Sequence, residues 1–231
     1  MVVPAAWGRM AAWMDLSLQT IALWAVPVVL AITLHEAAHG YVAKRFGDRT
    51  AEMLGRITLN PLKHIDLIGT ILVPGALILA AKATGGPLFI FGWAKPVPVN
   101  FGNLRDPKRD MLWVAGAGPA ANFVMAFLWG LVLKLSAASG SWPNEGLFLM
   151  AQAGISVNLV LMALNLIPIP PLDGGRIAVS LLPARASAAW RRIEPWGLFI
   201  ILALLMTGLL NNLMDPLLRA GEYLLQLLLG F

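Results

Sequence analysis

The sequence lacks cysteine and is poor in charged residues. With no cysteine among 231 residues, disulfides and thiolate-ligated metal sites are excluded. Only 13% of the residues are Asp, Glu, Lys or Arg, whereas a soluble domain carries about a quarter. Hydrophobic residues make up 58% of the chain, and the mean hydropathy is +0.74. This balance excludes an ordinary soluble protein and indicates one that lies in a lipid bilayer.

The net charge of +5 does not indicate a nucleic-acid partner. Lys and Arg are scattered along the chain beside apolar segments and are not gathered on one amphipathic face. Such charges are typical of those that orient membrane helices. The stretch before the first long apolar run holds one basic residue, Arg9, and no clear small-residue cleavage site. We therefore expect that run to act as an uncleaved anchor.

Several apolar stretches approach the length of about 20 residues that a helix needs to cross a bilayer. They cover residues 18–46, 111–135, 146–167 and 196–213. A shorter apolar segment, 216–231, is expected to lie at the membrane interface or to dock on the other helices. We predict an all-α polytopic membrane protein, a bundle of about four to six transmembrane helices. We expect it to form one domain over residues 1–231, with its functional core at about 18–182.

The region between the first two spans is irregular. Residues 53–60 and 89–101 hold β-branched, aromatic and proline residues in short runs, which predicts short strands. Residues 67–81 are apolar but short, with Pro74 and Gly75 at their middle. The prediction is therefore a small β or re-entrant element between two core helices.

Basic residues indicate how the spans are oriented. They cluster at the end of the first span, at the start of the second and at the end of the third, which the positive-inside rule assigns to the cytoplasm. The intervening region must then return to the side it left, so we expect 67–81 to be re-entrant or to lie on the surface, alone or paired with 87–99. We predict a multi-pass protein of the cell's inner (plasma) membrane. The residues concerned are Lys44, Arg45, Arg49, Arg105, Lys108, Arg109, Arg176, Arg185, Arg191 and Arg192.

Residues 35–39 read His-Glu-Ala-Ala-His. Histidines at i and i+4 lie on one face of a helix and can share one Zn²⁺, while Glu36 can act as a general base on a metal-bound water. Chance is a weak explanation, because the chain has three histidines and two of them are here. They also fall inside an apolar helix, where ionisable groups are costly and usually functional.

A catalytic zinc usually has three protein ligands and one open position. Asp173 is the best candidate for the third ligand, because it follows a proline-rich break at the cytoplasmic end of the third span. The alternative role for Asp173 is to cap a helix that starts at Gly174, since Asp is a favoured N-cap. His64 and Asp66 offer a rival third ligand or a second metal site. A polar turn explains them better, because no further ligand is near in sequence.

Three motifs together resemble the site-2 protease family, polytopic membrane metalloproteases that cut transmembrane segments of other proteins. They are HEAAHGYVAKRFGD at 35–48, AGAGPAAN at 115–122 and NLIPIPPLDGGR at 165–176, in the order that the family has. The resemblance is to the compact bacterial members without PDZ or CBS domains. It implies that His35, His39 and Asp173 bind one Zn²⁺ and that Glu36 is the catalytic base.

The resemblance also suggests roles for two asparagines. Asn165 matches a position that binds substrate backbone near the zinc, although it could instead satisfy backbone groups freed by the prolines. Asn122, with Gly116 and Gly118, matches the family's pattern in the second helix. Small residues there allow close helix packing, and Asn122 could also line the substrate cavity.

The function that follows is hydrolysis of peptide bonds in or near transmembrane segments of a membrane-protein partner, as in regulated intramembrane proteolysis. The substrate helix must be unwound first, and a strand edge at 53–60 or 89–100 could hold it. The alternatives are an idle scaffold or chaperone that binds transmembrane helices, and a metal transporter. The intact Glu36 argues against a scaffold, and the lack of other acidic residues inside the spans argues against a transporter.

Overall fold

The computed structural model of the protein describes residues 18–84, 92–138 and 145–230. These residues form helices joined by short connections, and none of them forms a strand, which confirms the all-α prediction. The longest helices are α2 (Leu18–Arg45), α5 (Pro107–Ala138), α6 (Glu145–Leu166) and α10 (Leu209–Leu229). The shorter α-helices are α3 (Thr50–Met53), α4 (Val73–Thr84), α7 (Asp173–Leu181), α8 (Ala184–Arg191) and α9 (Gly197–Met206). Short 3-10 or π turns are η1 (Pro61–Lys63), η2 (Leu67–Leu72), η3 (Phe101–Asn103) and η4 (Glu194–Trp196).

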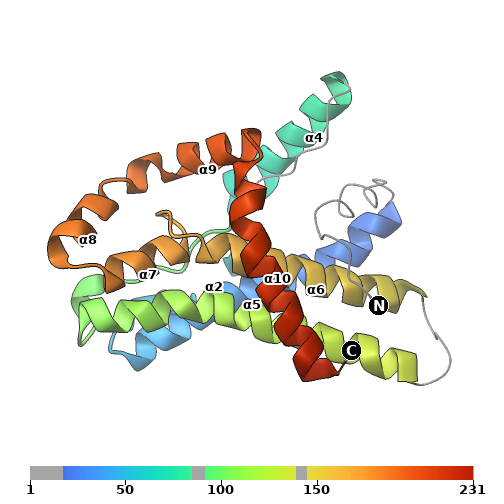
Figure 1. Cartoon of the computed structure of the whole chain (residues 1–231), viewed down its shortest axis with the longest axis horizontal. Helices are drawn as coiled ribbons and strands as arrows, with labels where there is room; N and C mark the ends of the chain where they lie inside the picture. The colour runs from blue at the N-terminus through green and yellow to red at the C-terminus, as the bar shows by residue number, and fades with distance from the viewer. Residues whose placement is uncertain (1–17, 85–91, 139–144, 231) are drawn as a thin grey trace.

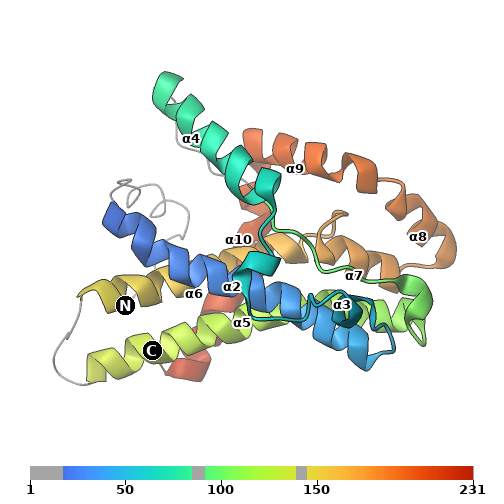
Figure 2. The ribbon, with the colours of Figure 1, turned by 180° about the vertical axis from the view of Figure 1, so that it is seen from behind.

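Helices α2, α5 and α6 pack against one another and form the centre of the molecule (Figures 1 and 2). At one end, Ala43 of α2 and Met111 of α5 share a buried cluster against which Ile177 of α7 packs. The end of α2, the start of α5 and the helix that follows α6 therefore meet at one end of the bundle. This is the arrangement that the distribution of basic residues predicts.

Four of the described helices are long and apolar enough to cross a membrane: 22–45, 67–84, 107–136 and 146–166. The second of these is longer than the short, broken segment expected at 67–81, because η2 and α4 run on without a break at Pro74 and Gly75. Its re-entrant or surface position stays a prediction. Pro74 lies directly after the π turn η2, and the carbonyl of Gly69, five residues before it, accepts the N–H of Trp93 instead. Helix α4 projects away from the bundle (Figures 1 and 2).

The span expected at 196–213 is not a single helix. Helix α9 ends at Met206, and Gly208 adopts a left-handed conformation with φ of 75°, which ends helices efficiently because glycine has no Cβ. The chain then turns by 90° into α10. If this bent pair counts as one span, the described helices include up to five.

Helix α10 docks on the bundle, which is one of the two positions expected for 216–231. Its buried residues recur every three or four positions, so one face packs on α5 and α6 (Figure 1). A Cβ on Gly221 would lie 2.8 Å from Met162 and 2.9 Å from Leu159 of α6. The two helices therefore approach closely at this glycine.

The predicted short strands are absent from the described parts of 53–60 and 89–101; residues 85–91 lie outside the described structure. Residues 54–60 form turns and bends, and 92–100 are extended but pair with no strand. Pro96 and Pro98 remove two backbone donors from the extended stretch. The N–H groups of Lys95 and Val97 are used elsewhere, by the carbonyl of His64 and by the Glu36 carboxylate.

Candidate metal centre

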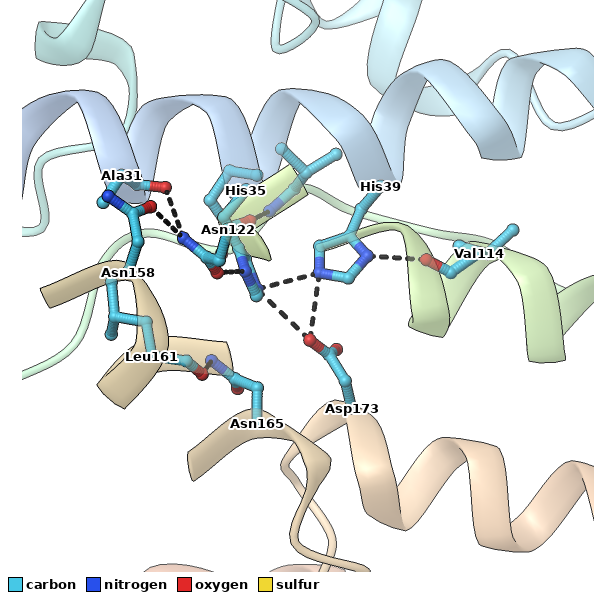
Figure 3. Close-up of polar contacts among 11 residues, drawn as sticks. Ala31, His35, His39, Val114, Asn122, Asn158, Leu161, Asn165 and Asp173 are labelled. Carbon is cyan, nitrogen blue, oxygen red and sulfur yellow. Dashed lines mark hydrogen bonds and ion pairs between the residues drawn. The ribbon is translucent and has the colours of Figure 1, made fainter. Parts of the chain in front are cut away.

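The structure brings His35, His39 and Asp173 together (Figure 3). The two histidines project from one face of α2, and Asp173 is the first residue of α7. The Nε2 atoms of the histidines lie 3.0 Å apart, and Asp173 Oδ2 lies 3.2 Å from each of them. All three side chains are buried. Residues 138 positions apart in the chain thus present three ligand atoms to one point.

Hydrogen bonds at the far side of each imidazole fix which nitrogen faces that point. Nδ1 of His35 bonds to the amide oxygen of Asn122 at 2.6 Å, and Nδ1 of His39 bonds to the carbonyl of Val114 at 2.7 Å. Since both partners are acceptors, each Nδ1 carries the proton, and each Nε2 of a neutral ring offers a lone pair toward Asp173. If both rings were also protonated at Nε2, two N–H donors would face each other across 3.0 Å.

A bound cation would give the three converging ligand atoms a shared partner. Asp173 Oδ2 is buried and has no hydrogen-bond donor within the described structure, which is costly for a buried carboxylate. Zinc bound tetrahedrally at about 2.0–2.2 Å from each ligand would space the ligand atoms by roughly 3.3 Å, close to the observed separations. Two imidazoles and one carboxylate leave the fourth position open, as in catalytic rather than structural zinc sites.

Gly118 of α5 makes room for the cluster. A Cβ at this position would lie 2.6 Å from Nε2 of His35 and would also collide with His39. Gly118 therefore faces the ligands directly, a role beyond the helix packing expected of it. Gly116, one half-turn earlier, has nothing within 4 Å of its Cβ position, so no close packing depends on it.

A chain of buried amides supports His35. The amide oxygen of Asn122 accepts the hydrogen bond from His35, and its amide nitrogen donates to Asn158 Oδ1 at 3.0 Å and to the Ala31 carbonyl at 3.3 Å (Figure 3). Asn158 in turn donates to the Gly154 carbonyl at 2.8 Å. Both asparagines are fully buried. The part played by Asn158 was missed from the sequence, although a polar residue inside an apolar span was a usable signal.

Asn165 lies on the last turn of α6, beside the loop that leads to Asp173 (Figure 3). Its amide nitrogen donates to the Leu161 carbonyl at 3.0 Å. This carbonyl lies one turn back within α6 and is not among the backbone groups freed by the prolines, so the bond does not decide between the two roles expected for Asn165. The side chain is only half-buried, so its substrate role stays a prediction.

The loop between α6 and α7 is held tightly. A Cβ on Gly174 or Gly175 would collide with backbone atoms of this loop, and one on Gly197 would collide with Pro170. The indole nitrogen of Trp190 donates to the Pro168 carbonyl at 3.0 Å. Asp173 makes no capping hydrogen bond, and the N-cap of α7 is Leu172, so the helix-capping alternative is wrong.

Glu36 is half-buried beside His35. Its Oε2 accepts a hydrogen bond from the backbone N–H of Val97 at 2.7 Å. The extended stretch 92–100 therefore passes next to Glu36 on α2, although about 60 residues of sequence separate Val97 from Glu36. The HEAAH motif alone gave no indication of this contact.

His64 and Asp66 take no part in the cluster. The buried His64 bonds through Nε2 to the Thr58 carbonyl at 3.0 Å, and Asp66 accepts from the Gly69 N–H at 2.7 Å, capping η2. Among the described residues, the only group of three or more potential ligands is His35, His39 and Asp173. A second metal site at His64 and Asp66 is therefore unsupported.

Comparisons with known proteins agree with this chemistry. The model of Peptidase family M50 matches residues 23–140 and 130–208. The "Putative zinc metalloprotease YwhC" of Bacillus subtilis is 40% identical over 201 residues, covering 85% of this chain and 86% of that protein. Rip2 of Mycolicibacterium smegmatis, whose name carries the same description, is 33% identical over 186 residues, 80% of this chain and 66% of its own.

Rip2 of Mycobacterium tuberculosis is 26% identical over 208 residues, which cover 87% of this chain and 71% of that protein. No solved structure matches the chain. The family match spans far more than half of the sequence, and the buried cluster of two histidines and an aspartate supplies the ligands that a zinc peptidase needs. The chain belongs to Peptidase family M50, the site-2 proteases, and is a zinc metalloprotease with several helices able to span a membrane.

Proposed function

We propose that this protein is an intramembrane endopeptidase that cleaves peptide bonds in or near the transmembrane segments of other membrane proteins. The observation that carries the proposal is the position of the ligands. His35 and His39 are buried in α2, a helix apolar enough to cross a membrane. Ionisable groups at such positions are costly and mark functional sites.

Each residue of the metal centre has a distinct role in the proposed reaction. His35, His39 and Asp173 hold the ion, while Asn122 and the Val114 carbonyl fix the two imidazoles. Bound zinc supplies a Lewis acid for the scissile carbonyl and lowers the pKa of water toward neutrality. Glu36 takes the proton as water attacks and then delivers it to the leaving amine.

The two asparagines receive different proposed roles. Both the oxygen and the nitrogen of Asn122 are bonded within the protein, which favours an orienting role over the predicted substrate contact. Asn165 is half-buried, and no described group bonds to its amide oxygen. That oxygen is free to accept an N–H of an unwound substrate near the metal.

Substrate binding by strand addition finds little support at 92–100. The N–H groups of Trp93, Lys95, Val97 and Asn100 are bonded within the protein. Prolines 96 and 98 have none to give. Only three backbone donors of this stretch, those of Gly92, Ala94 and Val99, remain for a substrate strand.

We also propose that the metal faces the cytoplasmic side of the inner membrane. The basic residues at the ends of α2, α5 and α6 support this orientation. A cavity of about 640 Å³ lies at the same end, lined by Pro170, Gly175 and Arg176 from the Asp173 loop and α7. It offers water a route toward that loop.

The test compares cells that make the native protein with cells that make Glu36→Gln. Membrane proteins are collected and their new termini are mapped by mass spectrometry. The proposal predicts termini inside transmembrane segments that depend on Glu36, and purified Glu36→Gln protein that keeps its zinc. A scaffold or transporter would be indifferent to the substitution, and termini confined to soluble loops would contradict intramembrane cleavage.

A further inference from the structure

We propose that the backbone N–H of Val97 is a positioning group for Glu36. It binds one carboxylate oxygen, Oε2, at 2.7 Å, and so leaves the other oxygen to serve as the base. This inference rests on the proposed function and adds a part of the chain outside the family's three motifs.

The stretch that carries Val97 is anchored on both sides. The Lys95 N–H donates to the His64 carbonyl at 2.9 Å, and the Asn100 N–H donates to Asp48 Oδ2 at 2.7 Å. Asp48 is fully buried. The Val97 amide therefore sits between two fixed points, which is what a positioning group requires.

Arg56 fixes the same stretch from a third direction. Its guanidinium donates to the carbonyls of Lys95 and Pro96 at 3.2 Å each, and also to the Lys63 carbonyl. Several donors of one planar group thus hold the peptide units just before Val97. The orientation of the Val97 N–H is set by these bonds as well as by its own.

The stretch around Val97 also packs directly against α2. Gly40 lies one turn after Glu36, and a Cβ there would be 3.1 Å from the Val97 side chain and 3.0 Å from Ile57. The absent side chain allows the extended backbone to come close enough to reach Glu36. Because Pro96 and Pro98 have restricted φ angles, the backbone on either side of Val97 has little freedom.

The physical consequence is a restrained base. A glutamate side chain has three rotatable bonds, and holding a catalytic group in place removes an entropic cost from the reaction. The opposite reading is a latch that holds Glu36 away from its task. The several hydrogen bonds that hold residues 95–100 in place favour a permanent support. Loss of the Val97 N–H should lower kcat if it supports Glu36 and raise kcat if it is a latch.

The experiment uses the full-length protein in detergent with a substrate identified by the terminus mapping. Val97→Pro removes the N–H, and Val99→Pro is the matched control, because it adds a proline to the same stretch at an N–H for which no described bond exists. We expect Val97→Pro to lower kcat by about 10- to 100-fold, the effect of losing a hydrogen bond to a charged group. KM and zinc content should change little, and Val99→Pro should stay within about threefold of the native kcat.

Val97→Ala keeps the N–H and should lose less than Val97→Pro. If Val97→Pro fails to fold, as judged by its zinc content and unfolding temperature, Arg56→Met provides the second test by loosening the anchors, with an expected fall in kcat at unchanged zinc content. A raised kcat in either variant would establish a latch and overturn the inference, as would a Val97→Pro effect equal to that of Val99→Pro. If Glu36→Gln itself cleaved normally, the proposed function would fail instead, so the two failures are distinguishable.

Discussion

The amide oxygen of Asn122 lies 2.6 Å from Nδ1 of His35. This bond sets the tautomer and the ring orientation of a metal ligand from a different helix. Through Asn122 and Asn158, the ligand on α2 is tied to α5 and α6. The geometry of the metal centre therefore depends on how these three helices pack.

Replacing Asn122 should weaken metal binding. We expect Asn122→Ala to lower the zinc affinity by about 10- to 100-fold, as is typical when a partner of a ligating histidine is lost. Asn165→Ala is the matched control, because it should leave zinc affinity unchanged and raise KM. Competition with a chelator measures both affinities. Equal zinc affinities in the two variants would show that the hydrogen bond from His35 to Asn122 does not contribute to metal binding.

Asp173→Asn should cost more than any loss of a supporting residue. The carboxylate is the proposed third ligand, so we expect zinc affinity to fall by more than about 100-fold and cleavage to be lost with it. Asp66→Asn is the control, since Asp66 caps η2 and takes no part in the cluster. Metal content after dialysis, measured by mass spectrometry, reports the difference. Retained zinc and activity in Asp173→Asn would show that another group completes the site.

Gly118→Ala adds one methyl group where the ligands converge. The methyl would lie 2.6 Å from His35 Nε2, which is too close without displacing the imidazoles. We expect loss of zinc and of cleavage, whereas Gly116→Ala on the same helix should behave as the native protein, because its Cβ position is open. Zinc content and thermal unfolding of the two variants test this. Normal zinc binding by Gly118→Ala would mean that α2 and α5 can separate without harm to the site.

Asp48 offers a test of stability against pH. Burial raises the pKa of this carboxyl, but hydrogen bonds from Thr50, Asn100 and Asn103 outweigh that effect, so its pKa is lowered. A lowered folded-state pKa gives stability that is fully present above the unfolded value of about 3.9 and is lost as pH falls through the folded value. We expect Asp48→Asn to destabilise the protein by about 1–3 kcal/mol at neutral pH.

The stability difference between the native protein and Asp48→Asn should narrow as the pH falls below the unfolded pKa of about 3.9. Unfolding temperatures at neutral pH and at about pH 3 measure it. A gap of constant size across this range would mean that the charge of Asp48 contributes nothing and that only its shape matters.

The features that were predictable from the sequence are those encoded by local spacing. His35 and His39 fall one turn apart on a helix, and Asp173 follows a run of prolines that must end α6, so their types and positions indicated a shared metal. The close approach of Gly118 to the imidazoles, the bond between Asn122 and Asn158, and the contact of Val97 with Glu36 join distant parts of the chain. One sequence without tertiary information cannot reveal them.

The errors have local physical causes. Residues 67–81, with Pro74 and Gly75 at their middle, were expected to be too short and irregular for a span, but the π turn η2 runs directly into α4 there. The span expected at 196–213 did not take account of Gly208, whose left-handed conformation allows the chain to bend by 90°. The strand expected at 89–101 does not form in its described part, because Pro96 and Pro98 lack an N–H. The N–H groups of Val97 and Asn100 donate to side-chain carboxylates and are not available to a neighbouring strand. The extent of the domain, 1–231 with a core at 18–182, stays a prediction.

The third ligand belongs to α7, late in the chain. A growing polypeptide that has made α2 and α5 carries two histidines and a base, but it cannot hold zinc with three ligands until Asp173 has left the ribosome. If the proposed function holds, the chain cannot cleave its substrates during this part of its synthesis. Proteolytic competence arrives only when the last core helix is complete and the loop after it has folded back.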